Sequence, residues 1–170
     1  MRSTHKKLNI EMETAGVSVW TKSWSDRSAR VTLLVDFGDR FAVVVVPRSG
    51  FWFLPGGGVE QNESIEEAAE REAFEELGLK VNVSHVIATF DVTLISKDTR
   101  EHLKIPPFVV VHATPTEGQL KKKYAPNRKI LLVRKSERDT LPQDLKVPIE
   151  FEWMKPYFCI SREIVQECIR

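Results

Sequence analysis

Short runs of apolar residues recur along most of the chain, and their pattern predicts several β-strands. They lie at 17–20, 30–37, 40–47, 79–95, 107–114 and 147–156. The dipeptide Gly38-Asp39 between the second and third runs is a turn signal, so residues 30–47 are predicted to form a β-hairpin. The aromatic stretch FWFLP then leads into three consecutive glycines, Gly56 to Gly58.

The clearest helical pattern runs from residue 64 to about residue 77. Ser64 is followed three residues later by Glu67, which is a capping-box signature, and Gly78 is well placed to end the helix. At 100° per residue, one face of this helix is apolar. That face contains Ile65, Ala68, Ala69, Ala73 and Leu77. Because strands are expected on both sides of this helix in the sequence, the pattern indicates an α/β domain with a mixed β-sheet.

The remaining segments are less regular. Residues 1–14 are polar and are predicted to be a loose, flexible N-terminal arm, whereas 160–170 reads as a closing helix. The segment 118–143 contains one apolar run, ILLV, and is predicted to be an irregular excursion from the core. A chain of 170 residues suits one domain, which we place at 15–170.

Charge is distributed unevenly along the chain. The formal net charge is +1, but the stretch from Glu60 to Glu76 holds eight glutamates and one arginine, Arg71, which leaves +8 for the rest. Such a layout suits a cation held by the acids and an anionic ligand attracted by the bases. The two cysteines, Cys159 and Cys168, give no disulfide framework, and no apolar run approaches the length of a membrane span. We therefore expect a protein of a reducing, cytoplasmic compartment with no membrane partner.

Two of these glutamates fall on the wrong side of the helix for a solvated charge run. Glu72 and Glu76 lie one turn apart in the middle of the apolar face, with Glu75 on its flank, whereas Glu67 and Glu70 point away. Two unpaired carboxylates facing inward would be costly, and protonation, a basic partner or a divalent cation would each relieve that cost. The glycines before the helix permit close backbone approach, so they could offer a carbonyl to a metal or amides to a phosphate.

These residues together resemble a known family pattern. Residues 57–79 fit the Nudix box, G-x5-E-x7-R-E-U-x-E-E-x-G-U with U an aliphatic residue, at every charged and glycine position. The fixed positions are Gly57, Glu63, Arg71, Glu72, Glu75, Glu76 and Gly78. One aliphatic position is Ala73 rather than a larger residue, which is a change in packing. The preceding FWFLPGG also resembles the W-x-x-P-G-G lead-in of the family.

The resemblance implies an α/β/α sandwich and a MutT-like pyrophosphohydrolase that uses Mg²⁺ or Mn²⁺. Its substrate would be a nucleoside diphosphate linked to another moiety, such as a nucleoside triphosphate, a nucleotide sugar or ADP-ribose. Glu72, Glu75 and Glu76 would ligate metal together with a backbone carbonyl of Gly57 or Gly56. Arg71 would orient the glutamates and Glu63 would support the loop. Clustered divalent ions suit this chemistry, because they neutralise phosphoryl oxygens and activate water.

Several further residues are candidates for the site. Glu150, three residues before Trp153, resembles an acid that many family members carry there, and Glu117 and Glu152 are alternatives for the general base. Arg48 follows the third strand, where many members carry a basic residue that contacts substrate. Among Phe51, Trp52 and Phe53, we select Trp52 as a residue that stacks on a base, although core packing is the simpler explanation for at least two of the three.

Alternative functions remain open at this point. The lysine run at 121–123 permits an RNA 5′-end pyrophosphohydrolase, and the fold also occurs in non-catalytic nucleotide-binding or regulatory modules. The complete set of box glutamates argues against such a module. The four histidines show no metal-ligand spacing. Markers of particular substrate subfamilies are absent downstream of the box, so the sequence selects no single substrate, and it leaves a homodimer open.

Overall fold

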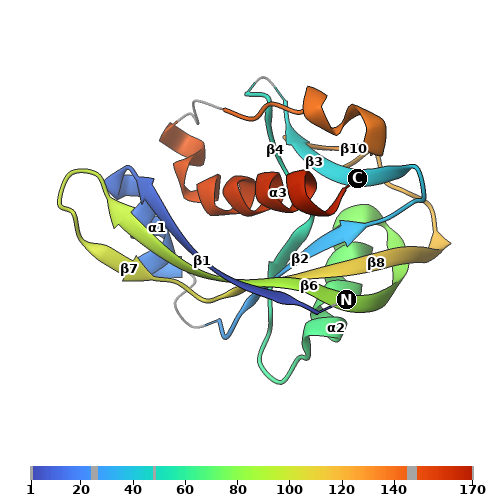
Figure 1. The fold of residues 1–170 in the computed structure, drawn as a ribbon, viewed down its shortest axis with the longest axis horizontal. Helices are drawn as coiled ribbons and strands as arrows, with labels where there is room; N and C mark the ends of the chain where they lie inside the picture. The colour runs from blue at the N-terminus through green and yellow to red at the C-terminus, as the bar shows by residue number, and fades with distance from the viewer. Residues whose placement is uncertain (1, 24–26, 48, 145–148, 170) are drawn as a thin grey trace.

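The computed structural model describes residues 2–23, 27–47, 49–144 and 149–169, which form two β-sheets with helices packed against them (Figure 1). The strands are β1 (Thr4–Met12), β2 (Arg30–Val35), β3 (Arg40–Val46), β4 (Phe51–Phe53), β5 (Gly56–Gly58), β6 (Leu79–Ser96), β7 (His102–Lys104), β8 (Phe108–Gly118), β9 (Lys123–Ala125) and β10 (Arg128–Arg134). The helices are α1 (Thr14–Ser23), α2 (Ile65–Glu72), the π-helical turn η1 (Ala73–Leu77), the 3₁₀ helices η2 (Lys135–Thr140) and η3 (Ile149–Met154), and α3 (Lys155–Cys168).

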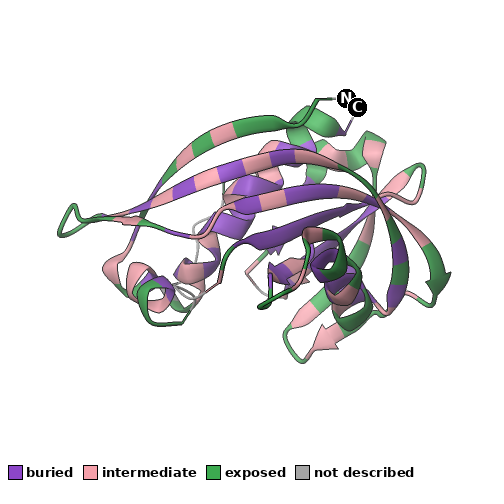
Figure 2. Ribbon diagram, turned by 90° about the horizontal axis from the view of Figure 1, so that it is seen from below, coloured by how far each residue is buried: buried purple, intermediate pink, exposed green. Residues whose placement is uncertain are grey.

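The first sheet is mixed. Its strand order is β1-β6-β8-β2-β5, and β7 also pairs with β6. The pairs β1–β6 and β2–β8 are parallel, whereas β6–β8 and β2–β5 are antiparallel. All six residues of β2 are buried, as expected for a strand covered on both faces. Buried positions recur along the long central strands, whereas the edge strand β1 is largely exposed (Figure 2).

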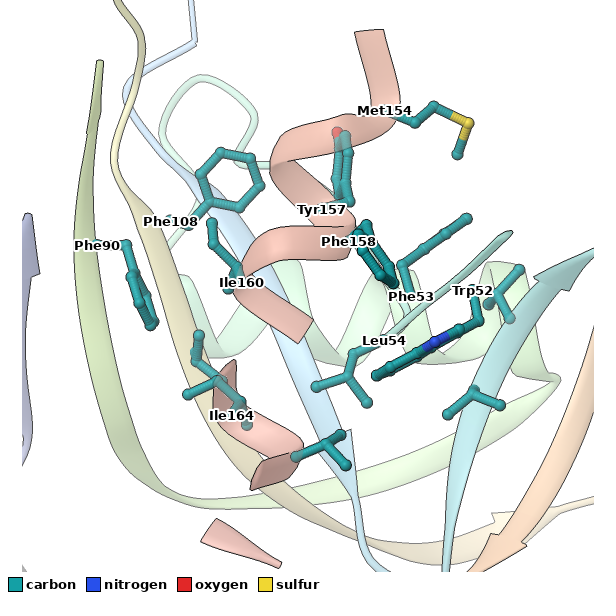
Figure 3. Close-up of a cluster of buried hydrophobic side chains, with 14 of the residues drawn as sticks. Trp52, Phe53, Leu54, Phe90, Phe108, Met154, Tyr157, Phe158, Ile160 and Ile164 are labelled. Carbon is teal, nitrogen blue, oxygen red and sulfur yellow. The ribbon is translucent and has the colours of Figure 1, made fainter. Parts of the chain in front are cut away.

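The second sheet is smaller and antiparallel, with the strand order β4-β3-β10-β9. Helix α3 lies between the two sheets. Phe158 of this helix packs on Phe51 and Trp52 of β4, and its Tyr157 packs on Phe108 of β8 (Figure 3). On the other face of the first sheet, the alanines of α2 join the core formed by β2, β6 and β8. Helices therefore cover both faces of a mixed sheet, and the predicted α/β fold is confirmed.

The acidic helix follows the sequence pattern closely. Ser64 caps α2, and the reciprocal hydrogen bonds between Ser64 and Glu67 complete the capping box. Gly78 ends the helix in the left-handed region, with a φ of 74°. The last turn is π-helical rather than α-helical, which the spacing did not indicate; single π-turns inside helices often lie at functional sites.

The N-terminal segment differs from the prediction. Residues 4–12 are not a loose arm but an edge strand that pairs in parallel with β6, from Thr4 opposite Ala88 to Met12 opposite Ser96. The inward side chains of Ile10 and Met12 are buried, and Lys6 donates hydrogen bonds to carboxylates of α3. The sequence signal for this strand was the alternation of apolar residues in LNIEM. That signal covers only five residues, which is short enough to be missed.

Four other predicted segments are corrected. Residues 17–20 were predicted to be a strand but belong to helix α1. The prediction failed because a four-residue apolar pattern fits either structure. Strands β2 and β3 do not form a hairpin; they join different sheets and share only one bridge, between Asp36 and Phe41. The segment 118–143 supplies β9 and β10, so it is part of the second sheet. The strand predicted at 147–156 is replaced over its described residues by η3 and the start of α3, which extends the closing helix towards the N-terminus from 160 to 155.

Candidate active site

The acidic helix presents its glutamates much as the projection predicted. The side chain of Glu72 is buried, with 8% of the residue exposed, and Glu76 is half-buried. Glu67 and Glu70 are exposed, and 57% of the Glu75 side chain is exposed. Phe74, on the side of the helix opposite the apolar face, is 58% exposed. Glu72 and Glu76 are thus the two carboxylates that the fold directs inward.

Arg71 fixes the position of several groups around Glu72. Its guanidinium donates two hydrogen bonds to Glu63, at 2.8 and 3.0 Å, and one to Glu72 Oε1 at 2.7 Å. It also donates to the carbonyl of Gly58 at 2.9 Å and, at 3.4 Å, to Glu75. Arg71 therefore links the glycine loop to the acidic helix and hydrogen-bonds the Glu72 carboxylate.

The glycine loop packs directly against both inward carboxylates. The amide of Gly56 donates to Glu76 Oε2 at 3.2 Å. A Cβ added to Gly57 would lie 2.5 Å from Cδ of Glu72, so any larger residue would displace that carboxylate. A Cβ added to Gly56, whose φ is 153°, would collide with the carbonyl of Val31. The loop is therefore shaped around the acids, and the presence of glycine at two of its positions has a steric cause.

Burial and like charge disfavour ionisation of these acids. Burial, followed by the neighbouring Glu72 carboxylate, raises the pKa of Glu76 to about 8, against the opposing effect of the hydrogen bond from the Gly56 amide. The pKa of Glu72 is also raised by burial, despite its hydrogen bond from Arg71. A cation placed between the two carboxylates would favour their ionised forms.

A cleft of about 260 Å³ opens over these carboxylates. It is lined by Arg30, Phe53, Gly56, Gly57, Gly58, Glu72, Glu76, Tyr124, Arg128, Trp153, Met154 and Tyr157. Glu72 and Glu76 lie beside the glycines, while β2, β4, β9, β10, η3 and the start of α3 supply the other lining residues. The cleft thus combines two carboxylates with two arginines.

The sequence analysis did not identify the cationic and aromatic walls of the cleft. Arg30 is buried, with its guanidinium carbon 5.0 Å from the ring centroid of Tyr157 and 5.4 Å from that of Trp20. Burial raises the pKa of Tyr157 to about 12 and also raises that of Tyr124, where the Glu76 carboxylate adds to the effect. An arginine at the start of the apolar run 30–37 was the signal that the sequence offered.

Some predicted site residues lie elsewhere. Trp52 is a core residue with 1% exposed, and its Nε1 donates to the carbonyl of Pro142 at 2.8 Å, so the prediction that it stacks on a base is wrong. The residue of the aromatic run that does line the cleft is Phe53. Because side chains alternate along a strand, Phe53 and Trp52 face opposite sides of β4. Arg48 lies outside the described residues.

The later candidates for the general base also separate. Glu150 is exposed and lines a neighbouring hollow rather than the cleft. Glu152 is buried, accepts a hydrogen bond from the amide of Glu13 and lies 3.8 Å from Lys155, which is a structural position. Glu117 pairs with Lys80 at an exposed site. None of the three lines the cleft that contains Glu72 and Glu76.

The inward carboxylates fit a hard divalent cation. Within the described residues, no three His, Cys, Asp or Glu side chains form a complete metal-binding group. Magnesium, however, commonly binds through one or two carboxylates and completes its shell with water and substrate phosphates. Glu72 and Glu76 supply such a pair, and Gly57 beside them brings backbone close to it. Oxygen donors of this kind suit Mg²⁺ or Mn²⁺ rather than softer metals.

The histidines contribute nothing to the cleft. His85 of β6 and His112 of β8 stack on each other, and neither lines the cleft. The described helices include none long and apolar enough to cross a membrane.

Comparison with known proteins agrees with this geometry. The chain is 34% identical over 71 residues to an oxidized purine nucleoside triphosphate hydrolase of Mus musculus, covering 42% of this chain and 46% of that protein. It spans less than half of the length of each of the curated relatives considered.

Solved structures share the fold. A MutT protein from Bacillus halodurans has a TM-score of 0.58 at 24% identity, with 84% of each chain covered. A UDP-X diphosphatase has a TM-score of 0.54 at 19% identity, covering 92% of this chain and 70% of that one. The family model described as the NUDIX domain matches residues 25–129, which include the acidic helix, the glycine loop and most of both sheets. The chain belongs to the NUDIX domain family.

Proposed function

We propose that the protein is a metal-dependent hydrolase of phosphoanhydride bonds, acting on a nucleoside diphosphate linked to a further group. The single observation that carries this proposal is the pairing of Glu72 and Glu76 in one cleft with Arg30 and Arg128. The carboxylates provide hard oxygen ligands for a divalent cation, and the arginines provide charge for phosphoryl oxygens. Two mutually repelling acids on an inward helix face would otherwise only lower stability.

The glutamates and Arg71 of the acidic helix have different roles in the proposed hydrolysis. Glu72 and Glu76 would hold Mg²⁺ or Mn²⁺, which supplies charge neutralisation and an activated water. Arg71 keeps Glu72 in place through its hydrogen bonds to Glu63 and Gly58. Glu75, whose carboxylate accepts a 3.4 Å hydrogen bond from Arg71, is our candidate for the acid that accepts a proton from water.

The arginines and tyrosines of the cleft would bind the diphosphate. Arg30 packs against the rings of both Trp20 and Tyr157, so the guanidinium that lines the cleft has little freedom to move. A guanidinium can donate two parallel hydrogen bonds to a phosphate, which fixes orientation as well as charge. Holding the phosphoryl group against a positioned water is the main contribution a protein makes to this type of reaction.

The relatives support nucleotides as the substrate class. The mouse relative is named for hydrolysis of oxidized purine nucleoside triphosphates, and one structural neighbour is named a UDP-X diphosphatase. Both names describe phosphoanhydride bonds next to a nucleoside. The choice among nucleoside triphosphates, nucleotide sugars and dinucleotide-type substrates is therefore a matter for direct assay.

The test is a hydrolysis assay over a panel of nucleoside triphosphates, nucleotide sugars and ADP-ribose, with Mg²⁺, with Mn²⁺ and with EDTA. Native protein is compared with Glu76→Gln and with Glu70→Gln, which changes an exposed glutamate of the same helix. We expect turnover that requires metal, is lost in Glu76→Gln and is retained in Glu70→Gln. Turnover that persists in EDTA, or in Glu76→Gln, would refute the proposal.

A further inference from the structure

The cleft over Glu72 and Glu76 is too small for a whole nucleotide derivative. Its volume is about 260 Å³, whereas pockets that enclose drug-sized ligands usually measure about 300–1,000 Å³. Two carboxylates and two arginines also suit phosphate and metal rather than a nucleobase. The rest of a nucleotide substrate must therefore lie outside this cleft.

A larger hollow of about 660 Å³ adjoins the cleft. We call it the second hollow; it is lined by Val46, Pro47, Ser49, Pro126, Asn127, Lys129, Glu150 and Phe151. It shares two walls with the cleft. Asn127, in the turn before β10, and Lys129 of β10 line the second hollow, while Arg128 between them lines the cleft.

The second shared wall is η3. Its Phe151 lines the second hollow and its Met154 lines the cleft. Arg128 joins the two walls, because its guanidinium carbon lies 5.9 Å from the Phe151 ring centroid and its Nη2 is 3.4 Å from Sδ of Met154. Arg128 and Phe151 are thus the side chains that stand between the two spaces, and a phosphate at Arg128 would place its attached group towards Phe151.

The lining of the second hollow suits a flat, uncharged polar group. Phe151 is partly exposed and provides an aromatic surface, and the prolines and Val46 add apolar walls. Asn127 is exposed and its amide can both donate and accept, as base edges require. Among the described residues that line it, the charges of Lys129 and Glu150 offset each other.

We propose that the second hollow binds the nucleoside part of a nucleotide substrate, with its base against Phe151 and its phosphates directed past Arg128 into the cleft. The direction of the phosphates rests on the function proposed above, whereas binding of the nucleoside itself does not. Asn127 is then a residue that contributes to base selection, and Phe151 contributes affinity. Glu150, expected beforehand to contact metal or water, instead faces the nucleoside.

The proposal is tested by binding without catalysis. The 5′-monophosphates of adenosine, guanosine, cytidine and uridine are titrated calorimetrically into metal-free native protein, Phe151→Leu, Asn127→Ala and Phe74→Leu. Phe74→Leu is the matched control, since Phe74 is an exposed phenylalanine outside both spaces. Stacking on an aromatic side chain typically contributes about 1–3 kcal/mol per base, or roughly 5- to 150-fold in affinity.

We expect at least one nucleotide to bind native protein and Phe74→Leu alike, and Phe151→Leu to bind it about 10-fold more weakly. Asn127→Ala should change the preference among the four bases, and because Asn127 is exposed, this variant tests the proposal even if Phe151→Leu folds poorly. Ribose 5-phosphate should bind all four proteins equally. Absence of nucleotide binding at millimolar concentrations, or equal binding by native protein, Phe151→Leu and Asn127→Ala, would overturn the proposal.

Failure of this proposal can be distinguished from failure of the proposed function. Metal-dependent hydrolysis with the same KM in native protein, Phe151→Leu and Asn127→Ala would remove the nucleoside site and leave the hydrolase intact. Nucleotide binding that is weakened in Phe151→Leu, in a protein that hydrolyses nothing in the panel, would do the reverse.

Discussion

The replacement Gly57→Ala tests the packing of the glycine loop against the acidic helix. The φ of Gly57 is outside the left-handed region, so alanine is compatible with its backbone. The obstacle is the Glu72 carboxylate, because the new Cβ would lie 2.5 Å from Cδ and 2.8 Å from Oε2 of that residue. Carbon atoms prefer separations of about 3.5–4.0 Å. The carboxylate would therefore have to move by roughly 1 Å, away from the 2.7 Å hydrogen bond that Arg71 donates to it.

Two consequences follow in magnitude. Inserting a methyl group into a packed site usually costs about 1–3 kcal/mol of stability. A displacement of about 1 Å at a catalytic group can lower the rate by about 100-fold. We expect Gly57→Ala to lose stability within this range and to retain about 1% of native hydrolysis. The measurements are urea unfolding and the metal-dependent hydrolysis assay.

A neighbouring glycine provides the control. A Cβ at Gly58 would meet only the side chain of Arg27, at 3.4 Å or more, so Gly58→Ala should change stability by less than about 0.5 kcal/mol. The cause is isolated by the double variant Gly57→Ala with Glu72→Ala, in which the obstructing carboxylate is absent. Gly57→Ala should then cost little. If Gly57→Ala lowers the free energy of unfolding as much in the Glu72→Ala background as in the native protein, contact with the Glu72 carboxylate is not the cause.

Three further predictions concern stability. Trp52→Phe should lower the free energy of unfolding by about 1–3 kcal/mol, because the carbonyl of Pro142 loses its donor, and should leave KM unchanged; a raised KM at unchanged stability would contradict the core position of Trp52. Ser64→Ala should cost about 1 kcal/mol in urea unfolding through loss of the helix cap, and no loss would contradict it. Burial works to raise the pKa of Asp36, but the hydrogen bonds from Lys135, His112 and the Gly38 amide together outweigh it and hold that pKa below the ordinary 3.8, so the stabilisation is present above pH 3.8 and is lost as pH falls through the folded-state value. Asp36→Asn should therefore cost roughly 1 kcal/mol at pH 7 and less at pH 3, and an equal cost at both pH values would exclude the ionised pair as the cause.

Local rules explain which parts of the site were predictable. The capping box at Ser64, the helix end at Gly78 and the inward positions of Glu72 and Glu76 all depend on residues within one or two turns of each other. Such features are set by hydrogen bonding and periodicity inside one segment. Arg71 could be placed near these glutamates for the same reason, although its bidentate bond to Glu63 depended on the fold of the loop.

The other walls of the cleft depend on tertiary structure. Arg30, Arg128 and Tyr157 come from three distant segments, and nothing in their local sequence indicates that they converge on Glu76. The separation of β2 and β3 into different sheets had the same origin, since each strand found a better partner far along the chain. Propensity and turn signals describe neighbours in sequence, and long-range pairing overrides them.

Ambiguity of short patterns explains the remaining errors. Residues 17–20 and the alternating run LNIEM within β1 are both short, and four to six alternating residues do not distinguish helix, strand and loop. In the aromatic run, the choice between Trp52 and Phe53 depended on which face of β4 meets the cleft. That face is decided by the packing of α3 against the strand, which buries Trp52 against Phe158.

Mn²⁺ binding followed by electron paramagnetic resonance tests directly whether Glu72 and Glu76 together bind a divalent cation in the cleft. Free Mn²⁺ is measured during titration of native protein, Glu72→Gln, Glu76→Gln and the control Glu70→Gln. We predict that native protein and Glu70→Gln remove Mn²⁺ from solution equally, and that each of the other two variants loses this binding. Equal Mn²⁺ binding by all four proteins would show that Glu72 and Glu76 do not hold the cation.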